Sequence, residues 1–381
     1  MELIMVRVKN PPDASRSIDV NLGERSYPIY IGYGVLRRTG KLLRAVLPTT
    51  GKGTVITHDA IFKLHGDPLK ESLEDAGIQT QVISVPEGDA SKSWDAAGRL
   101  FGDLIDFGMD RSSMILAFGG GVIGDLAGFL AATFLRGVGL VQIPTTFLGQ
   151  VDSGIGGKTA LNHPKGKNLI GAFYQPRLSI VDPRLLETLS MRELRAGLAE
   201  VVKYGVIADG ELFHMLERNV ERILGKDPSL LMEIIARCCA IKARLVELDE
   251  RDTKGLRIKL NYGHTAGHAL EIITHLDVRH GEAVAVGMTV ASEISNRLGL
   301  MGGDDIKRQE NLLRLFGLPT QLPKTDVQRL LELMHRDKKA REGVIRFVLP
   351  TGIGKEPAVE AISDQFLLET LRSAMERRGD G

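Results

Sequence analysis

The order of apolar and polar residues divides the chain into two regions. Up to about residue 182, short apolar runs alternate with longer segments in which apolar residues recur every three or four positions. The short runs predict buried β-strands and the longer segments predict amphipathic helices. Because strands alternate with helices along the chain, we expect a mostly parallel sheet that helices cover on both faces.

The predicted elements of this region are bounded by glycine, proline and serine, which commonly begin or end them. Strands are predicted at residues 17–20, 27–31, 54–57, 80–85, 114–118, 140–144 and 178–181, the first two as a hairpin. Helices are predicted at residues 35–47, 63–76, 91–107 and 122–135. Ser91 is expected to cap the third of these helices.

After Asp182-Pro183 the pattern becomes helical almost to the end of the chain. Helices are predicted at residues 192–207, 211–224, 229–249, 264–273, 281–298, 304–316, 326–336 and 364–378, and only residues 345–349 look extended. We therefore predict a Rossmann-like α/β nucleotide-binding domain at 1–182 and a mainly α-helical domain at 183–381. A cleft between the two halves is the expected site.

Composition sets bounds on function. The 381 residues suffice for two domains, and 43% apolar and 25% charged residues are typical of an ordinary soluble globular protein. A net charge of +1 gives no support for nucleic-acid binding, and no apolar run is long enough to predict a membrane span. The two cysteines, Cys238 and Cys239, are adjacent and form no CxxC motif, which favours a reducing cytoplasm.

Glycine-rich turns supply the first candidate chemistry. An apolar strand runs into three glycines at 119–121, and a helical segment follows. Strand, glycine turn and helix together present backbone N–H groups and a helix N-terminus to a phosphate. A second glycine turn at 154–157 precedes Lys158, with Lys167 and Asn168 close behind. This stretch therefore indicates anion binding.

Histidines in the helical region suggest a metal. His264 and His268 lie four residues apart on one helix face, His280 begins the next helix, and Glu200 lies earlier in the chain. Histidine nitrogens plus one carboxylate, with one position left open, suit a catalytic zinc ion. A histidine pair at this spacing is often structural, so three histidines and a glutamate beside small residues are the stronger signal.

Several cations accompany this histidine group. Most lysines are solvated surface residues. Lys158 is a better candidate because it follows a glycine turn, and Lys203 because it lies one helical turn from Glu200. Such groups bind phosphate or carboxylate. The candidate cations are Lys158, Lys167, Lys203, Lys242, Arg257, Lys338 and Lys339.

Seven motifs in one order give a resemblance to a known family. They are GGGVIGDLAGF, IPTTFLGQVDSGIGGKTALN, GKNLIGAFYQP, GLAEVVKYG, LNYGHTAGHALE, HGEAVAVGM and RDKK. With them the chain strongly resembles the 3-dehydroquinate synthases. The resemblance implies conversion of 3-deoxy-D-arabino-heptulosonate 7-phosphate to 3-dehydroquinate and inorganic phosphate. It implies catalytic NAD⁺ and a divalent metal, Zn²⁺ or Co²⁺, and a sequence of oxidation, phosphate elimination, reduction, ring opening and aldol closure. It also suggests a homodimer.

The resemblance also assigns residues to roles. As metal ligands it implies Glu200, His264 and His280. As NAD⁺ contacts it implies Asp89, Lys92, Gly120, Gly121, Val122, Asp125, Thr145, Thr146 and Thr188. As catalytic groups we expect Lys158, Asn168, Lys203, Arg257 and His268. As further substrate contacts we expect Asp152, Lys167, Lys242, Asn261 and one lysine of the Lys338-Lys339 pair, preferably Lys338.

Three positions depart from the family pattern. Gly154 stands where a second serine is common, Asp89 replaces the commoner glutamate, and His58 occupies the place of an asparagine or aspartate. Each is expected to affect cofactor affinity. Two alternatives remain: a related sugar-phosphate cyclase that makes another carbocycle, and a metal-dependent polyol dehydrogenase, which would release NADH stoichiometrically. A scaffold or nucleotide sensor would leave the histidines and lysines unexplained.

Overall fold

A computed structural model describes residues 15–274, 278–336 and 344–376. Contacts between residues divide the chain into two compact units. The sheet unit contains the described residues up to Leu189 together with Pro228–Arg251, and the helical unit contains Ser190–Asp227 and the described residues from Asp252 on. A single boundary at residue 183 would place Pro228–Arg251 in the helical half, whereas this segment packs with the sheet.

The sheet unit is built as the alternation of short apolar runs and helical segments predicts. Its strands are β1 (Arg16–Val20), β2 (Tyr27–Ile31), β3 (Lys52–Thr57), β4 (Gln79–Ser84), β5 (Met114–Gly119), β6 (Gly139–Pro144), β7 (Lys158–His163), β8 (Gly166–Phe173) and β9 (Leu178–Val181). Its helices are α1 (Thr39–Val46), α2 (Asp59–Asp75), α3 (Trp94–Asp106), α4 (Gly121–Thr133) and α8 (Pro228–Leu248).

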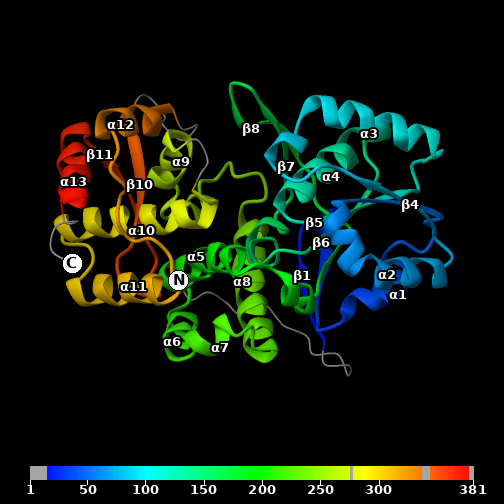
Figure 1. Ribbon diagram of the computed structural model, residues 1–381, viewed down its shortest axis with the longest axis horizontal. Coiled ribbons are helices and arrows are strands. Elements are labelled where there is room, and N and C mark those ends of the chain that lie inside the picture. The colour runs from blue at the N-terminus through cyan, green and yellow to red at the C-terminus, as the bar shows by residue number, and fades with distance from the viewer. Residues whose placement is uncertain (1–14, 275–277, 337–343, 377–381) are drawn as a thin grey trace. The chain divides into compact units, whose positions relative to one another are not determined.

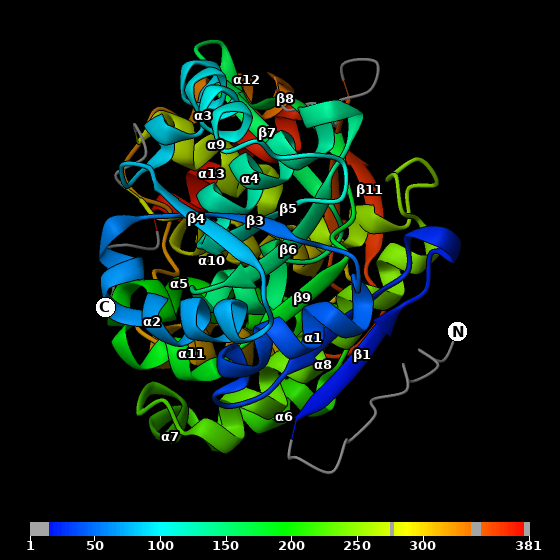
Figure 2. The same ribbon diagram turned by 90° about the vertical axis from the view of Figure 1, so that its right-hand side faces the viewer.

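Seven of these strands form one sheet in the order β1-β2-β9-β6-β5-β3-β4. Figure 2 shows β4, β3, β5, β6 and β9 beside one another. Every neighbouring pair is parallel except the β1–β2 hairpin. The predicted mostly parallel sheet with an N-terminal hairpin is confirmed.

Side chains that alternate along the central strands enter two separate cores. On β5, Met114, Leu116 and Phe118 pack with residues of α1 and α2, whereas Ile115 and Ala117 pack with residues of α3 and α4. All five are buried. Burial on both faces explains why β5 reads as a continuous apolar run instead of an alternating one.

The hairpin of β7 and β8 was not predicted as strands. Its strands pair antiparallel and form a separate two-stranded sheet. Most of β8 is exposed, so its sequence lacks the buried positions that reveal a strand. The predicted cap of α3 also differs by two residues: Ser93 accepts a hydrogen bond from the backbone N–H of Ala96, whereas the Ser91 hydroxyl donates to the carbonyl of Pro86.

The helical unit follows the predicted helices, with two corrections. Its elements are α5 (Met191–Ile207), α6 (Gly210–Arg218), α7 (Val220–Leu224), α9 (His264–Ile273), α10 (His280–Arg297), α11 (Gly303–Leu315), α12 (Val327–Arg336), β10 (Ile345–Leu349), β11 (Ala358–Ile362) and α13 (Asp364–Glu376). The helix predicted at 211–224 is broken at Asn219 into α6 and α7. Residues 345–349 are not the only extended segment, because β10 pairs with β11.

Glycines let three helices of this unit approach closely. Helix α10 lies between α5 and α9 (Figure 1). A Cβ atom on Gly281 of α10 would lie 1.9 Å from the carbonyl oxygen of Ala196 on α5. A Cβ on Gly287 would lie 1.9 Å from the carbonyl oxygen of Gly263, which precedes α9 and has a φ of 80°. Only glycine fits at such backbone contacts.

None of the helices in the described ranges has both the length and the apolar character needed to cross a membrane.

Candidate active site

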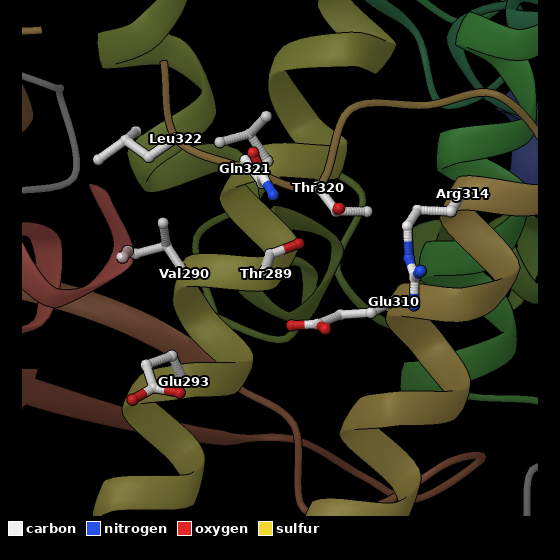
Figure 3. Close-up of a pocket in the computed structure, with 10 residues that line it drawn as sticks. Thr289, Val290, Glu293, Glu310, Arg314, Thr320, Gln321 and Leu322 are labelled. Atoms are coloured by element: carbon white, nitrogen blue, oxygen red, sulfur yellow. The ribbon is translucent and has the colours of Figure 1, made fainter. Parts of the chain in front are cut away.

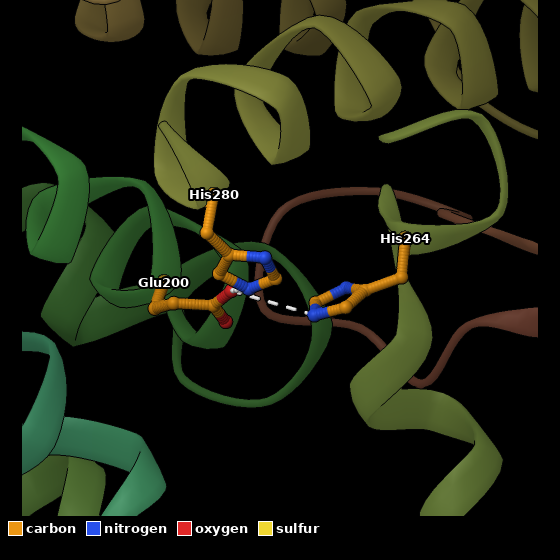
Figure 4. Close-up of side chains that lie close together, drawn as sticks. All are labelled: Glu200, His264 and His280. Carbon is orange, nitrogen blue, oxygen red and sulfur yellow. Dashed lines mark ion pairs between the residues drawn. The ribbon is translucent and has the colours of Figure 1, made fainter. Parts of the chain in front are cut away.

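Three side chains of the helical unit converge on one point. Glu200 comes from α5, His264 is the first residue of α9 and His280 the first residue of α10. One ligand atom of each lies within 4.8 Å of the other two (Figure 4). The Oε1 atom of Glu200 is 3.5 Å from Nε2 of His264 and 3.3 Å from Nε2 of His280. These distances bring together the three residues predicted as metal ligands.

The donor set and its spacing fit a divalent metal. Two ligands at about 2.05 Å from a tetrahedral ion lie about 3.3 Å apart, which is close to both distances measured from Glu200. The Glu200 side chain is almost fully buried, and a buried carboxylate requires compensating charge. Two imidazoles and one carboxylate match the ligands of catalytic zinc sites, which leave a fourth position for substrate.

Each imidazole is oriented through its other nitrogen. Nδ1 of His264 lies 3.1 Å from the backbone carbonyl oxygen of Tyr262, and Nδ1 of His280 lies 2.7 Å from Oε1 of Glu271. A proton on Nδ1 can therefore be donated in both rings, and the lone pair of Nε2 then faces Glu200. This arrangement of donor and acceptor is typical of metal-bound histidines.

The charges of the cluster stabilise the ionised carboxylate. Burial opposes ionisation of Glu200, but Lys203, His264 and His280 outweigh it and hold its pKa well below the usual range. Burial drives the pKa of His264 well below 6.5. Burial also opposes the charge on His280, but hydrogen bonds and charge from Glu200 and Glu271 raise its pKa to about 10.

Two other predicted residues of the helical unit, Lys203 and His268, lie beside this cluster. The ammonium of Lys203 forms an ion pair with Glu200 from one turn further along α5, and both side chains are buried. The ring of His268 lies beside those of His264 and His280, with centroids 5.3 and 6.1 Å away. Arg257, which is buried, and Asn261 belong to a 3₁₀ turn at Arg257–Asn261 just before α9.

The glycine turn predicted to bind a nucleotide lies in the sheet unit. Gly120 lies between β5 and α4, and no side chain caps the N-terminus of that helix. A Cβ on Gly120 would lie 3.0 Å from Cγ2 of Thr146, and one on Gly121 would lie 3.3 Å from Oγ of Ser153. The buried hydroxyl of Thr145 has no hydrogen-bond partner among the described residues. Free helix N–H groups and an unpartnered hydroxyl fit a dinucleotide phosphate and its ribose.

One hydrogen bond and one ion pair join residues predicted for the cofactor to Asn168 and Lys167. The buried ammonium of Lys92 contacts both Asp125 on α4 and the side-chain oxygen of Asn168. Lys167 pairs with Asp89 at 2.6 Å. Lys167 and Asn168, at the start of β8, therefore connect the β7–β8 hairpin to the predicted cofactor residues.

The remaining predicted residues have varied surroundings. The ammonium of Lys242 on α8 lies 2.9 Å from a carboxylate oxygen of Asp152. The hydroxyl oxygen of Thr188 lies 2.7 Å from Nε2 of His65. Lys158 is exposed at the start of β7, and Val122 lies in the first turn of α4. Lys338 and Lys339 lie outside the described residues.

Sequence reasoning missed two groups that orient the histidines. Glu271 follows His264 by seven residues and His268 by three, so all three lie on one face of α9. That spacing was the available signal. The contribution of Tyr262 is its backbone carbonyl, which residue types do not reveal. Its buried hydroxyl bonds to Ser292 at 2.7 Å and to Gln309 at 2.8 Å, which fixes the segment before α9.

A separate cavity of about 260 Å³ lies elsewhere in the helical unit. It is lined by residues of α10 and α11 and by the segment that follows α11, among them Thr289, Glu293, Glu310, Arg314 and Thr320 (Figure 3). None of the predicted site residues that the structure describes lines it.

Comparison with known proteins matches both parts of the chain. The family described as 3-dehydroquinate synthase N-terminal matches residues 82–196, and 3-dehydroquinate synthase C-terminal matches residues 197–340. A curated relative from Pelobacter propionicus, named 3-dehydroquinate synthase, is 49% identical over 353 residues, which cover 92% of this chain and 97% of the relative.

Two solved structures share the fold. A 2-deoxy-scyllo-inosose synthase complexed with carbaglucose-6-phosphate, NAD⁺ and Co²⁺ has a TM-score of 0.85 at 27% identity, covering 94% of this chain and 100% of that one. A 2-epi-5-epi-valiolone synthase from Streptomyces hygroscopicus with NAD⁺ and Zn²⁺ bound has a TM-score of 0.85 at 26% identity, covering 94% of this chain and 99% of that one.

Proposed function

The chain belongs to the 3-dehydroquinate synthase family, and we propose that it catalyses the reaction for which the family is named. The substrate is 3-deoxy-D-arabino-heptulosonate 7-phosphate, and the products are 3-dehydroquinate and inorganic phosphate. The observation that carries this proposal is the convergence of Glu200, His264 and His280 from three separate helices. A nucleotide-binding glycine turn alone would fit many oxidoreductases. The cluster is more specific because it adds a candidate metal-ion site.

The cofactors proposed are NAD⁺ and a divalent metal ion, as in the two cyclase structures. When bound, NAD⁺ supplies reversible acceptance of a hydride, and the metal ion supplies a Lewis acid for neighbouring substrate oxygens. Gly120, Gly121 and Thr145 fit the nucleotide. Glu200, His264 and His280 fit the metal ion.

The residues of the helical unit are proposed to have two tasks. Lys203 balances the buried charge of Glu200 and so keeps the carboxylate ionised for the cation. Arg257, Asn261 and His268 hold hydroxyl and carboxylate groups of the substrate beside the cluster. A seven-carbon sugar acid has several such groups, and holding it in one orientation lowers the entropic part of the barrier.

The cations of the sheet unit are proposed to receive the phosphate and the carboxylate. Lys158, Lys167 and Lys242 supply positive charge, and Asp152 fixes the ammonium of Lys242. Asn168 supplies an amide that can contact a hydroxyl. Positioned ammonium groups stabilise the negative charge that accumulates on a departing phosphate.

The chemistry explains why such a site needs a redox cofactor for a reaction with no net oxidation. Phosphate leaves by elimination only if the proton on the adjacent carbon is acidic. A carbonyl on the next carbon along makes it acidic, so a hydroxyl there is oxidised first. NAD⁺ would be regenerated when the hydride is returned to the substrate. The departing phosphate oxygen can accept the proton, which agrees with a site richer in ammonium groups than in general bases.

A coupled assay tests this function. Purified protein with Zn²⁺ and catalytic NAD⁺ should release one phosphate per heptulosonate 7-phosphate consumed, with no net accumulation of NADH absorbance. Stoichiometric NADH would instead support a polyol dehydrogenase. Phosphate release from glucose 6-phosphate, which lacks the carboxylate, would support a different sugar-phosphate cyclase. Inactivity on the heptulosonate substrate with metal and NAD⁺ bound would refute the proposal.

A homodimer and a cytoplasmic location are proposed as well. The family resemblance supports the dimer, which sedimentation velocity at several protein concentrations would test. Cys238 and Cys239 are buried and form no disulfide among the described residues, in agreement with a reducing compartment. Localisation of a tagged chain in fractionated cells would test the second point.

A further inference from the structure

We propose that Glu271 is a positioning residue that fixes the orientation and the tautomer of His280 for metal binding. This inference rests on the metal site proposed above. Its basis is the contact of 2.7 Å between Oε1 of Glu271 and Nδ1 of His280, on the side of the ring opposite Glu200.

The placement of Glu271 suits this role. It lies on α9 two turns after His264, on the same face as His264 and His268. Its side chain is only 10% exposed. A buried carboxylate is costly unless it is paired, and His280 is its partner. Helix α9 therefore contributes a ligand at its first residue and the support for a second ligand nearer its end.

The two ligating histidines differ in how they are held. Nδ1 of His264 faces a backbone carbonyl, and that imidazole is 12% exposed. Nδ1 of His280 faces a side chain, and its imidazole is 35% exposed. The more exposed ring has more freedom to rotate and therefore depends more on its hydrogen-bond partner. That partner can be removed by mutation, unlike the carbonyl that holds His264.

Glu271 acts on the tautomer as well as on rotation. A carboxylate accepts the Nδ1–H of a neutral imidazole and leaves the Nε2 lone pair toward Glu200. It also makes the ring a stronger donor to a cation.

The test compares Zn²⁺ affinity, measured by competition with a chromophoric chelator, in the full-length protein and its variants. Glu271→Ala should weaken Zn²⁺ binding by roughly 10- to 100-fold. Glu271→Gln, which keeps the shape and one acceptor oxygen, should lose less. The matched control is Glu293→Ala: this carboxylate lies on α10 and pairs with Arg297, and its removal should leave Zn²⁺ affinity within twofold of wild type.

A second readout separates positioning from general destabilisation. With Co²⁺ as the metal, the visible absorption bands of Glu271→Ala should shift, because the geometry at the ion changes, while those of Glu293→Ala should not. Unchanged affinity and an unchanged Co²⁺ spectrum in Glu271→Ala would overturn the inference. If the alanine variant does not fold, the same comparison made with Glu271→Gln decides.

Failure of the metal site itself gives a different result. Wild-type protein that binds no Zn²⁺, or that binds it equally well after Glu200→Ala, would refute the proposed ligands. Loss of Zn²⁺ in Glu200→Ala with wild-type affinity in Glu271→Ala would leave the ligands intact and remove only the role of Glu271.

Discussion

Replacing Gly281 by alanine is expected to damage stability, metal binding and turnover together. Gly281 directly follows His280 on α10. An added Cβ would lie 1.9 Å from the carbonyl oxygen of Ala196, 2.5 Å from its carbonyl carbon and 2.6 Å from its Cα. All three are backbone atoms of α5, so rotation of a side chain cannot relieve the clash.

The magnitude follows from these distances. Real Cβ contacts almost never fall below 3.0 Å, so a contact of 1.9 Å must open by about 1 Å. Overpacking of this kind costs about 1–3 kcal/mol of folding free energy. His280 moves with the first turn of α10, whereas Glu200 stays on α5. A misplacement of about 1 Å at a reacting centre can reduce the rate about 100-fold.

Gly303→Ala is the matched control. Gly303 is the first residue of α11, and a Cβ there would meet nothing within 4 Å. The control should change the free energy of unfolding by no more than about 1 kcal/mol, with Zn²⁺ affinity unchanged. Urea unfolding, chelator competition and phosphate release measure the three effects. Wild-type values in all three for Gly281→Ala would refute the argument that this backbone contact places His280.

Three further outcomes are expected. Tyr262→Phe removes the hydroxyl that bonds to Ser292 and Gln309, so it should cost about 1–3 kcal/mol in urea unfolding; an unchanged midpoint would contradict this. Lys92→Met removes the partner of Asp125, whose pKa burial already raises and Lys92 opposes. The pKa of Asp125 then rises further, so the variant should lose about 1–3 kcal/mol at pH 7 and less at pH 4, where the carboxyl group accepts a proton; an equal loss at both pH values would contradict the pairing. Removing metal with a chelator should lower the free energy of unfolding by about 2.7 kcal/mol relative to protein with free Zn²⁺ at 100 times its Kd, and His264→Ala should abolish most of that difference.

The fold could be predicted where burial leaves a clear pattern. The run at 114–118 is buried on both faces, and its neighbours in the sheet share that character. The β7–β8 hairpin was not predicted because β8 is mostly exposed and its apolar residues stand in adjacent pairs instead of alternating with polar residues. The packing of Pro228–Arg251 with the sheet unit was not predicted for another reason. The amphipathic pattern of a helix indicates that one face is buried, but not which element covers that face.

The site could be predicted only in part from residue spacing. The interval between His264 and His268 indicated a pair on one helix face, yet the imidazole that approaches Glu200 from α9 is that of His264, joined by His280 from α10. Which rings meet a carboxylate depends on how α5, α9 and α10 cross, and these crossings are long-range contacts. The family resemblance supplied that information. Glu271 lay within the quoted motif but was not assigned a role.

Each histidine proposed as a metal ligand lies beside a glycine that makes a close backbone contact. Gly263 precedes His264 and receives Gly287 of α10 against its carbonyl, and Gly281 follows His280 and meets the carbonyl of Ala196 on α5. Backbone contacts have far fewer ways to relax than interdigitated side chains. Substituting a buried leucine of α5, such as Leu198, should therefore reduce stability by about 2–5 kcal/mol while the remaining folded protein keeps its Zn²⁺ affinity. A methyl group at Gly281 moves the ligand itself, so stability and metal binding should separate in the first case and fall together in the second.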